Sequence, residues 1–349
     1  MKLLVFGLGY SATAFAQRMA PRFSEIVGTH RALPAGERSS ERSTSSFPLA
    51  GKVVPSEAEG RMGVAPQAPP SEHVAPPPPR LAPAERRGPP PQGEGRLALP
   101  LRTFPGDEPR LAEDVAEADA ILVSVPPDPA LPAPHDPVLA AFGDAIRAAP
   151  RLKWLGYLST IGVYGDHDGA WIDETTAPAP VSRRSRARLA AELAWLALEG
   201  APVHVFRIAG IYGPGRSAFD KLAAGTAKRI VKPGQVFNRI HVDDIAAVLQ
   251  ASLDRPRPGA VYNVTDDEPA PPQDVIVEAA RLASLPLPPE IAYDDAALSP
   301  MAASFWGETK RVSNRLIREE LDLRLACPTY REGLRAILRE TPLRPARPE

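Results

Sequence analysis

A glycine-rich turn near the start of the chain has the composition of a phosphate-binding loop. The residues Gly7-Leu8-Gly9-Tyr10-Ser11-Ala12 follow an apolar run and precede an alanine-rich stretch. In a G-x-G-x-x-A turn the first glycine permits a tight bend, and the second lets the backbone approach a pyrophosphate. The small third residue lets a helix pack against a strand, and the N-terminus of that helix favours bound phosphate. The turn predicts a dinucleotide site formed by Gly7, Gly9, Tyr10, Ser11 and Ala12.

The end of the next apolar run bears on which dinucleotide binds. It reads Gly28-Thr29-His30-Arg31 and lacks the acidic residue that binds the ribose 2′-hydroxyl in NAD sites. Arg31 could pair with a 2′-phosphate instead. The sequence therefore predicts NADP as the cofactor and leaves NAD possible. The alternative for Arg31 is a solvated loop residue.

Alternating apolar and amphipathic segments would position this turn. The alternation is typical of a parallel sheet covered by helices on both faces, so the expected fold class is α/β with a doubly wound sheet. Ser11, Asp136 and Asp243 are expected to cap helices. Strands are predicted at Lys2–Phe6, Glu25–Thr29, Leu97–Thr103, Ala120–Val125, Trp154–Ser159, Val203–Ile208 and Ala260–Val264. Helices are predicted at Ser11–Ala20, Pro109–Ala116, Pro137–Ala148, Ser185–Leu198, Val242–Leu253, Pro272–Leu282 and Ser313–Glu320.

The chain contains 43 prolines, and they are unevenly spread. The segment 32–96 includes Pro76–Pro79 and Pro89–Pro91, has Phe47 as its one aromatic residue and contains no isoleucine. Such a composition cannot bury enough apolar surface to offset the entropy lost on ordering. We therefore predict a disordered, proline-rich insertion at 32–96, with a role as a proline-rich ligand as the alternative.

These patterns divide the chain into three parts. Residues 1–31 and 97–212 form the predicted dinucleotide-binding domain, interrupted by the insertion at 32–96. Residues 213–349 have more loops and prolines, as a smaller lobe that faces the substrate would. Within this lobe, residues 240–265 are expected to return to the main sheet.

Charge balance and cysteine content exclude several classes of function. The 41 Lys and Arg residues are balanced by 42 Asp and Glu residues, which gives no electrostatic reason to expect nucleic acid or an anionic membrane as a partner. The single cysteine, Cys327, excludes an internal disulfide and a multi-cysteine metal site. No segment approaches the ~18 apolar residues of a membrane span, and the apolar run after Lys2 is too short for a signal peptide. We expect a cytoplasmic protein with a small-molecule substrate.

Seven segments outside the insertion resemble the extended short-chain dehydrogenase/reductase superfamily. The resemblance is to its NAD(P)-dependent epimerase/dehydratase branch and its atypical, YeeZ-like members. It implies a Rossmann domain with a small, split C-terminal substrate lobe, cofactor contacts that include Ser124 and Pro126, and a possible homodimer. The segments are Leu3–Ala12, Ser124–Pro127, Tyr157–Asp166, Asp173–Thr175, Arg207–Arg216, Arg239–Asp244 and Tyr262–Val264.

The resemblance breaks at the residues that carry the superfamily's chemistry. Its members use a Tyr-x-x-x-Lys pair, but the matching helix reads Ser182 to Glu192 without a tyrosine or a lysine. Aligning on Glu192 puts Arg184 at the tyrosine position and Arg188 at the lysine position, whereas counting from Tyr164 puts Ser185 at the tyrosine position. Arginine stays protonated in proteins and cannot transfer a proton. Arg188 could still hold a ribose or a phosphate.

The resemblance implies that a Ser or Thr at the end of the preceding strand polarises the substrate oxygen. Thr160 or its neighbour Ser159 fits this role. Tyr164 is a candidate proton donor, although its position in the superfamily is a recurring structural one. The cluster Arg183, Arg184, Arg186 and Arg188 either clamps an anionic substrate or forms a solvated helix face.

Two functions therefore remain open. The first is an NAD(P)-dependent oxidoreductase or epimerase that acts on a carbonyl or hydroxyl substrate, such as an aldehyde or a nucleotide sugar, with an atypical active site. The second is a catalytically silent NADP-binding regulatory or scaffold protein, which the missing Tyr/Lys pair supports. A weaker third possibility is that the insertion disturbs the adenine end of the cofactor site.

Overall fold

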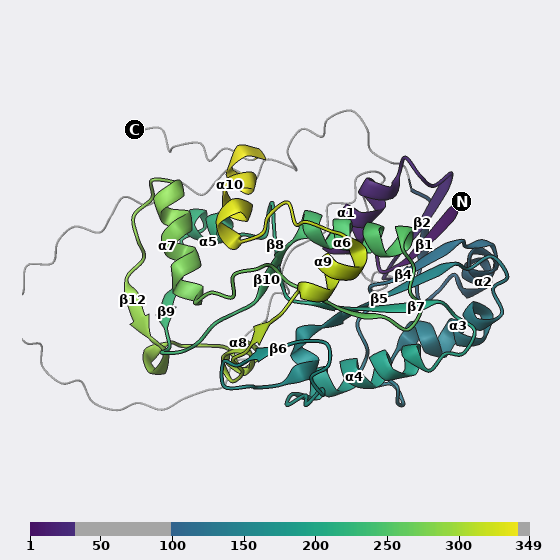
Figure 1. The fold of residues 1–349 in the computed structure, drawn as a ribbon, viewed down its shortest axis with the longest axis horizontal. Coiled ribbons are helices and arrows are strands. Elements are labelled where there is room, and N and C mark those ends of the chain that lie inside the picture. The colour runs from purple at the N-terminus through teal and green to yellow at the C-terminus, as the bar shows by residue number, and fades with distance from the viewer. Residues whose placement is uncertain (32–98, 341–349) are drawn as a thin grey trace, which may run out of the picture.

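A computed structural model describes residues 1–31 and 99–340, so the predicted insertion at 32–96 lies outside the described residues. The large lobe is built on one sheet with helices on both sides. A smaller lobe contains α5 (Ala218–Ala223), α7 (Pro272–Leu282) and α10 (Tyr330–Glu340) (Figure 1). This arrangement confirms the predicted α/β fold class.

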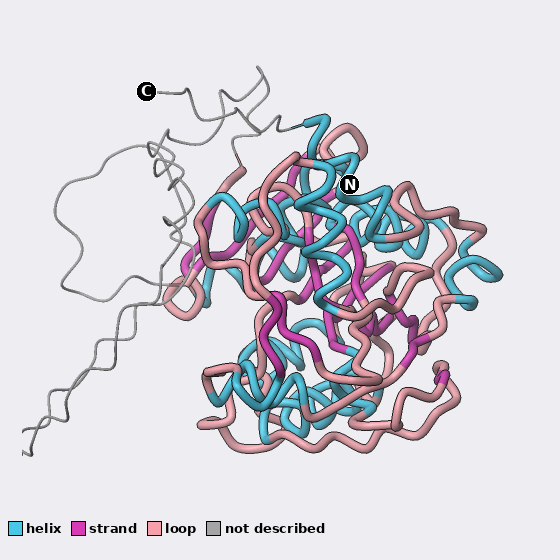
Figure 2. Tube along the Cα trace, turned by 90° about the vertical axis from the view of Figure 1, so that its left-hand side faces the viewer, coloured by secondary structure: helices cyan, strands magenta, loops and turns pink. Residues whose placement is uncertain are grey.

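Seven strands form the central sheet, and all the paired neighbours are parallel. Their order is β11-β7-β5-β4-β1-β2-β3. The chain runs outward from β1 to β3 and then returns to the other side of β1, which makes the sheet doubly wound with its switch point between β1 and β4. Figure 2 shows the strands in the interior with helices around them. The strands are β1 (Lys2–Phe6), β2 (Glu25–His30), β3 (Leu101–Thr103), β4 (Ala120–Val123), β5 (Trp154–Thr160), β7 (Val203–Ile208) and β11 (Val261–Val264).

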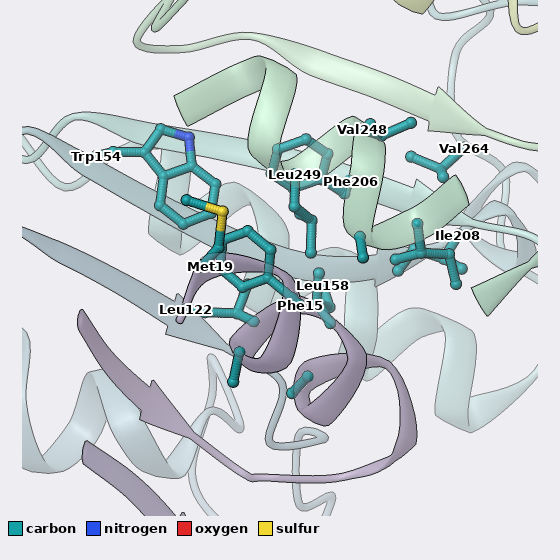
Figure 3. Packing of buried hydrophobic residues seen from close by; sticks show 14 of the residues in the cluster. Phe15, Met19, Leu122, Trp154, Leu158, Phe206, Ile208, Val248, Leu249 and Val264 are labelled. Atoms are coloured by element: carbon teal, nitrogen blue, oxygen red, sulfur yellow. The ribbon is translucent and has the colours of Figure 1, made fainter. Parts of the chain in front are cut away.

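Side chains alternate between the two faces of the sheet, and each face has its own core. Leu3 and Val5 lie in the cluster with Phe15 and Trp154, whereas Leu4 and Phe6 lie in the cluster with Trp195. Figure 3 shows the first cluster, in which the helices α1 and α6 cover the sheet. The helices of this face are α1 (Tyr10–Met19), α6 (Val242–Asp254) and α9 (Arg315–Leu321). Those of the other face are α2 (Glu108–Glu117), α3 (Pro137–Arg147) and α4 (Arg183–Leu196).

The smaller lobe has a separate apolar cluster that includes Phe219, Ile276 and Leu334. It is built from α5 (Ala218–Ala223), α7 (Pro272–Leu282), α10 (Tyr330–Glu340), β9 (Arg229–Val231) and β12 (Glu290–Ala292). Short strand pairs lie between the lobes: β8 (Gly210–Tyr212) pairs with β10 (Arg239–His241), and β6 (Trp171–Ile172) pairs with β13 (Arg311–Val312). The helix α8 spans Pro300–Trp306, and two 3₁₀ turns span Ile161–Tyr164 and Tyr293–Asp295.

The predicted helix caps are partly wrong. Asp136 caps α3 as expected, because its carboxylate accepts from the N–H groups of Val138 and Leu139. Ser11 instead lies inside α1, which begins after Gly9 without a side-chain cap. At α6 the cap is His241, whose Nδ1 accepts from the N–H of Asp243. In both helices the capping position lies two residues before the residue that the sequence predicts as the cap.

None of the helices in the described ranges combines the length and the apolar character that crossing a membrane would require.

Candidate dinucleotide and substrate cleft

A cleft of about 1380 Å³ runs from the carboxyl ends of the sheet strands to the smaller lobe. Single small-molecule sites usually occupy about 300–1,000 Å³, so this cleft has room for a cofactor and a substrate together. Of the residues singled out from the sequence, it is lined by Tyr10, Ser11, Ser124, Ser159, Thr160 and Arg188.

The glycine turn has the backbone geometry of a phosphate loop. Gly7 has φ +84°, and a Cβ atom there would lie 3.1 Å from the backbone nitrogen of Val125, so the turn requires glycine. The turn is tied to β2, because the N–H of Gly7 donates to Thr29 Oγ1 at 2.8 Å. By contrast, a Cβ atom on Gly9 would meet no atom of the described residues within 4 Å, apart from its two neighbours in the chain. The space beside Gly9 is open, as a bound pyrophosphate needs.

Ser11 supplies an independent sign of a ligand at this turn. Its side chain is buried and lines the cleft, yet its Oγ has no hydrogen-bond partner among the described residues. A buried hydroxyl without a partner is unfavourable unless a ligand or water satisfies it. A phosphate oxygen in the first turn of α1 would do so, and the residues present therefore fit a dinucleotide.

Tyr10 and Ala12 shape the same turn from opposite sides. Ala12 is fully buried in the core between α1 and the sheet. The Tyr10 hydroxyl donates to the carbonyl oxygen of Pro214 at 3.0 Å. This bond connects the turn to the loop that leads into α5 of the smaller lobe. Burial raises the pKa of Tyr10 to about 12, and the nearby Asp243 carboxylate adds to the effect. Tyr10 therefore stays neutral at physiological pH.

The other predicted cofactor contacts lie at the ends of neighbouring strands. Ser124 follows β4, lines the cleft and donates its N–H to the carbonyl oxygen of Phe6 at 2.8 Å. Pro126 is exposed, and it is not among the residues that line the cleft. Arg31 is exposed directly after β2, at the end of the first described range.

Thr160 lies at the end of β5 and lines the cleft. Its Oγ1 accepts a hydrogen bond from the N–H of Gly162 at 3.1 Å and caps the 3₁₀ turn that follows. Because this bond uses a lone pair of the oxygen, the O–H of Thr160 is left to donate. Thr160 can therefore donate a hydrogen bond to an oxygen atom of a bound substrate.

Ser159 points away from this role and into a buried polar network. Its hydroxyl donates to Glu192 Oε2 at 2.7 Å. The other oxygen of Glu192 forms an ion pair with Arg207, with 2.5 Å between Oε1 and Nη2. Ser159 therefore helps to hold the strand end in place.

Tyr164 belongs to the same network and has no exposed surface. Its hydroxyl accepts from Arg207 Nη1 at 2.8 Å and donates to Asn263 Oδ1 at 2.8 Å. Burial raises the pKa of Tyr164. Both hydrogen-bonding directions of the hydroxyl are thus occupied inside the core, and Tyr164 is not among the residues that line the cleft.

The helix α4 places an arginine beside the strand end. Arg188 lines the cleft, and its Nη1 donates to the carbonyl oxygen of Leu158 at 2.9 Å and to the Tyr157 hydroxyl at 3.2 Å. Arg184 is exposed and does not line the cleft. Ser185 faces the 3₁₀ turn, since its Oγ would lie 3.3 Å from a Cβ atom on Gly162. The cation at position 188 is therefore the group of α4 that reaches the cleft.

These features together define a class: a Rossmann-type protein with the fold of the epimerases and dehydratases of the short-chain dehydrogenase/reductase superfamily, and with a cleft whose residues fit a dinucleotide. No family model matches the chain. A functionally unknown conserved protein from Silicibacter pomeroyi DSS is 44% identical to it, with a TM-score of 0.74 and coverage of 97% of this chain and 98% of that one. The chain therefore belongs to the same family as this Silicibacter pomeroyi protein.

More distant comparisons agree with this placement. Protein YeeZ of Escherichia coli K12 is 30% identical over 151 residues, which are 42% of this chain and 53% of YeeZ, so the match spans about half the length of this curated relative. The dTDP-glucose 4,6-dehydratase of Bacillus anthracis, solved with NAD, shares the fold at 16% identity and a TM-score of 0.65, with 97% and 96% of the two chains covered. The human epimerase family protein SDR39U1, solved with NADPH, does so at 15% identity and a TM-score of 0.60, with 97% and 99% covered.

Proposed function

We propose that the protein is an NAD(P)-dependent oxidoreductase or epimerase that acts on a carbonyl or hydroxyl substrate through an atypical active site. The observation that carries the proposal is the buried Oγ of Ser11, which has no hydrogen-bond partner among the described residues and lines the same cleft as Thr160 and Arg188, next to the open space beside Gly9. The relatives solved with NAD or NADPH support the cofactor class. Aldehydes, ketones and nucleotide sugars are the candidate substrates.

The proposed cofactor contacts follow the strand ends. Gly7, Gly9 and Ser11 would hold the pyrophosphate, and Ser124 would lie further along the cleft. Arg31 would pair with a 2′-phosphate, which favours NADP over NAD. A nicotinamide cofactor supplies hydride transfer when it is bound.

The substrate oxygen would be handled by two side chains. Thr160 has its O–H available to donate, and this bond strengthens as negative charge develops on the substrate oxygen. The Arg188 guanidinium adds a fixed positive charge at the same strand end. The network of Ser159, Glu192 and Arg207 holds the backbone of β5 so that Thr160 keeps its position.

A second candidate function is a silent NADP-responsive module. One observation favours it: both hydrogen-bonding directions of the Tyr164 hydroxyl are taken by Arg207 and Asn263, and α4 contains no tyrosine. This candidate requires cofactor binding without turnover, which a kinetic assay separates from the first.

The replacement Gly9→Val tests the cofactor site that both candidates share. Gly9 has φ −87°, and in the described part of the chain an added Cβ atom would meet no atom beyond its chain neighbours, so the fold should tolerate the change. The valine side chain would occupy the space assigned to the pyrophosphate. We expect the melting temperature to be unchanged and NADPH binding to be lost. The fluorescence of the cofactor measures this binding. A folded Gly9→Val protein that binds NADPH as the native protein does would overturn the assignment.

A further inference from the structure

An arginine on β10, between the two lobes, lies half-buried at the end of the cleft away from the glycine turn. Arg239, on β10, lines the cleft, and its Nη1 donates to the carbonyl oxygens of Phe237 at 2.8 Å and Ala270 at 3.0 Å. Within the described ranges, Nε and Nη2 have no hydrogen-bond acceptor, and no carboxylate lies within ion-pair distance of the guanidinium. Two of the three guanidinium nitrogens are therefore left for a ligand.

The charge of Arg239 is poorly compensated by the protein. Burial lowers the pKa of Arg239, and the carboxyl group that most opposes this effect is that of Asp266. One oxygen of Asp266 accepts from the N–H of Glu268, and the other has no hydrogen-bond partner within residues 1–31 and 99–340. Burial raises the pKa of Asp266 to about 8, so this carboxyl is largely protonated at neutral pH. A buried cation without a counter-ion is unfavourable, and an anionic ligand would offset the cost.

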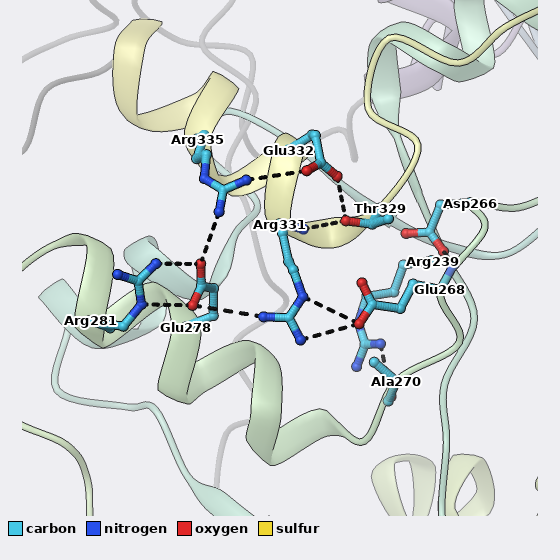
Figure 4. Close-up of polar contacts among 10 residues, drawn as sticks. All are labelled: Arg239, Asp266, Glu268, Ala270, Glu278, Arg281, Thr329, Arg331, Glu332 and Arg335. Carbon is cyan, nitrogen blue, oxygen red and sulfur yellow. Dashed lines mark hydrogen bonds and ion pairs between the residues drawn. The ribbon is translucent and has the colours of Figure 1, made fainter.

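Arg331, on α10 of the smaller lobe, is an arginine whose charge is compensated by carboxylates. Arg331 donates to Glu268 Oε1 at 3.2 Å and lies near Glu278 as well (Figure 4). It is not among the residues that line the cleft. Arg331 is therefore a suitable control for Arg239: Arg239 faces the cleft, whereas Arg331 is held by carboxylates.

Apolar and aromatic side chains line much of the cleft that Arg239 faces, together with polar ones such as Asn238 and Lys310. The rings of Phe237 and Trp306 meet edge to face with 5.3 Å between their centroids, and both residues line the cleft. Tyr330, Ile276 and Leu334 line it as well. A ligand bound at Arg239 would thus place the rest of its body against carbon atoms and ring faces.

We propose that this end of the cleft binds the anionic oxygen group, carboxylate or phosphate, of a substrate whose body is apolar or aromatic. A planar guanidinium binds such a group through two parallel hydrogen bonds, and Nε and Nη2 of Arg239 provide that pair. The inference rests on the proposed function, since it names the substrate class of the same cleft. It requires that the reacting carbonyl or hydroxyl and the anion belong to one molecule.

Three simple probes test the inference on the native protein. Phenylpyruvate carries a ring, a carbonyl and a carboxylate; phenylacetone lacks the anion; and phenyl phosphate replaces the carboxylate with a phosphate. We expect calorimetric titration of NADP⁺-saturated protein, which cannot reduce the ketone probes, to show about tenfold to a hundredfold tighter binding of at least one anionic probe than of phenylacetone. The tighter of the two anions identifies the oxygen group.

Variants then assign the effect to one side chain. Arg239→Met should abolish the preference for the anion, Arg239→Lys should keep part of it, and Arg331→Met should leave it unchanged. If Arg239→Met fails to fold, the inference is tested by Arg239→Lys and by the comparison of the three probes on the native protein. Equal binding of the neutral and anionic probes, no binding of any probe, or an equal loss in Arg331→Met overturns the inference.

The same samples separate this inference from the proposed function. The anionic probes are also titrated into protein without cofactor, and NADPH binding is measured independently by its fluorescence. Binding of NADPH without any preference for an anion overturns the substrate class and leaves the cofactor site standing. Binding of an anionic probe without any binding of NADPH overturns the proposed function and supports the anion site.

Discussion

Glu192 and Arg207 form a buried ion pair directly behind the strand end that carries Thr160, with 2.5 Å between Oε1 and Nη2. Glu192 comes from α4 and Arg207 from β7. Ser159 on β5 bonds the same carboxylate. The pair therefore joins a helix to two neighbouring strands at the point where the substrate oxygen would be bound.

Removing the charge of Glu192 should destabilise the protein strongly. In Glu192→Gln the Arg207 guanidinium stays buried without its counter-ion, which typically costs about 3 kcal/mol or more. Urea unfolding should show this loss in the free energy of unfolding. The exposed carboxylate of Glu199, just beyond α4, provides the control. We expect Glu199→Gln to change the stability by no more than about 0.5 kcal/mol, and equal effects of the two changes would contradict the structural role of the ion pair.

The hydroxyl of Thr160 should matter for turnover and not for cofactor binding. Thr160→Val keeps the shape of the side chain and removes the donor, so we expect kcat to fall by about 10²–10³ on any substrate that the native enzyme turns over. Thr160→Ser keeps the donor and should retain most of the activity. The Kd for NADPH should be the same in all three proteins. A Thr160→Val enzyme with native kcat would show that another group binds the substrate oxygen.

Arg31 should distinguish the two dinucleotides. Hydrogen bonds to a charged phosphate contribute about 1.5–3 kcal/mol, so Arg31→Ala should weaken NADPH binding by about tenfold to a hundredfold and leave NADH binding unchanged. Fluorescence titration with each cofactor measures both affinities. Arg110, an exposed arginine on α2 that does not line the cleft, is the matched control. If Arg31→Ala weakened the binding of NADPH and of NADH equally, this would argue against a contact between Arg31 and the 2′-phosphate.

The long elements could be predicted because their signals are local. The sequence predicts α7 (Pro272–Leu282) and β7 (Val203–Ile208) with the bounds that the structure has. The signals are the periodicity of the apolar residues and the flanking prolines. The strands β6 and β13 have two residues each, too few to show any period. The glycine turn could likewise be identified, since its function depends on neighbours along the chain.

The rest of the candidate site is assembled from elements that are far apart in the sequence. Arg207 on β7 pairs with Glu192 and donates to the Tyr164 hydroxyl, which in turn donates to Asn263 on β11, and no spacing rule connects these residues. One signal was present: Arg188, Glu192 and Trp195 share a face of α4 at helical spacing, which places a carboxylate among buried positions. The importance of Arg239 depends on the absence of a carboxylate partner in space, which the sequence does not show.

The stability of the protein should depend on pH through Asp266. Burial raises the pKa of this carboxyl to about 8 in the folded protein, against about 3.9 in an unfolded chain. Between these two values the folded state holds a proton that the unfolded state has released, so the free energy of unfolding falls as the pH rises from about 4 to about 8. The contribution of Asp266 should decline by about 1.4 kcal/mol per pH unit at most and level off above pH 8.

In Asp266→Asn this dependence is absent, so the difference in the free energy of unfolding should shift in favour of the variant at each step when urea unfolding is measured at pH 5, 6, 7 and 8. The exposed Asp295 provides the control, and Asp295→Asn should follow the native curve. A constant difference between the native protein and Asp266→Asn across this range would mean that the Arg239 charge keeps Asp266 ionised, and the case for an uncompensated cation in the cleft would weaken with it.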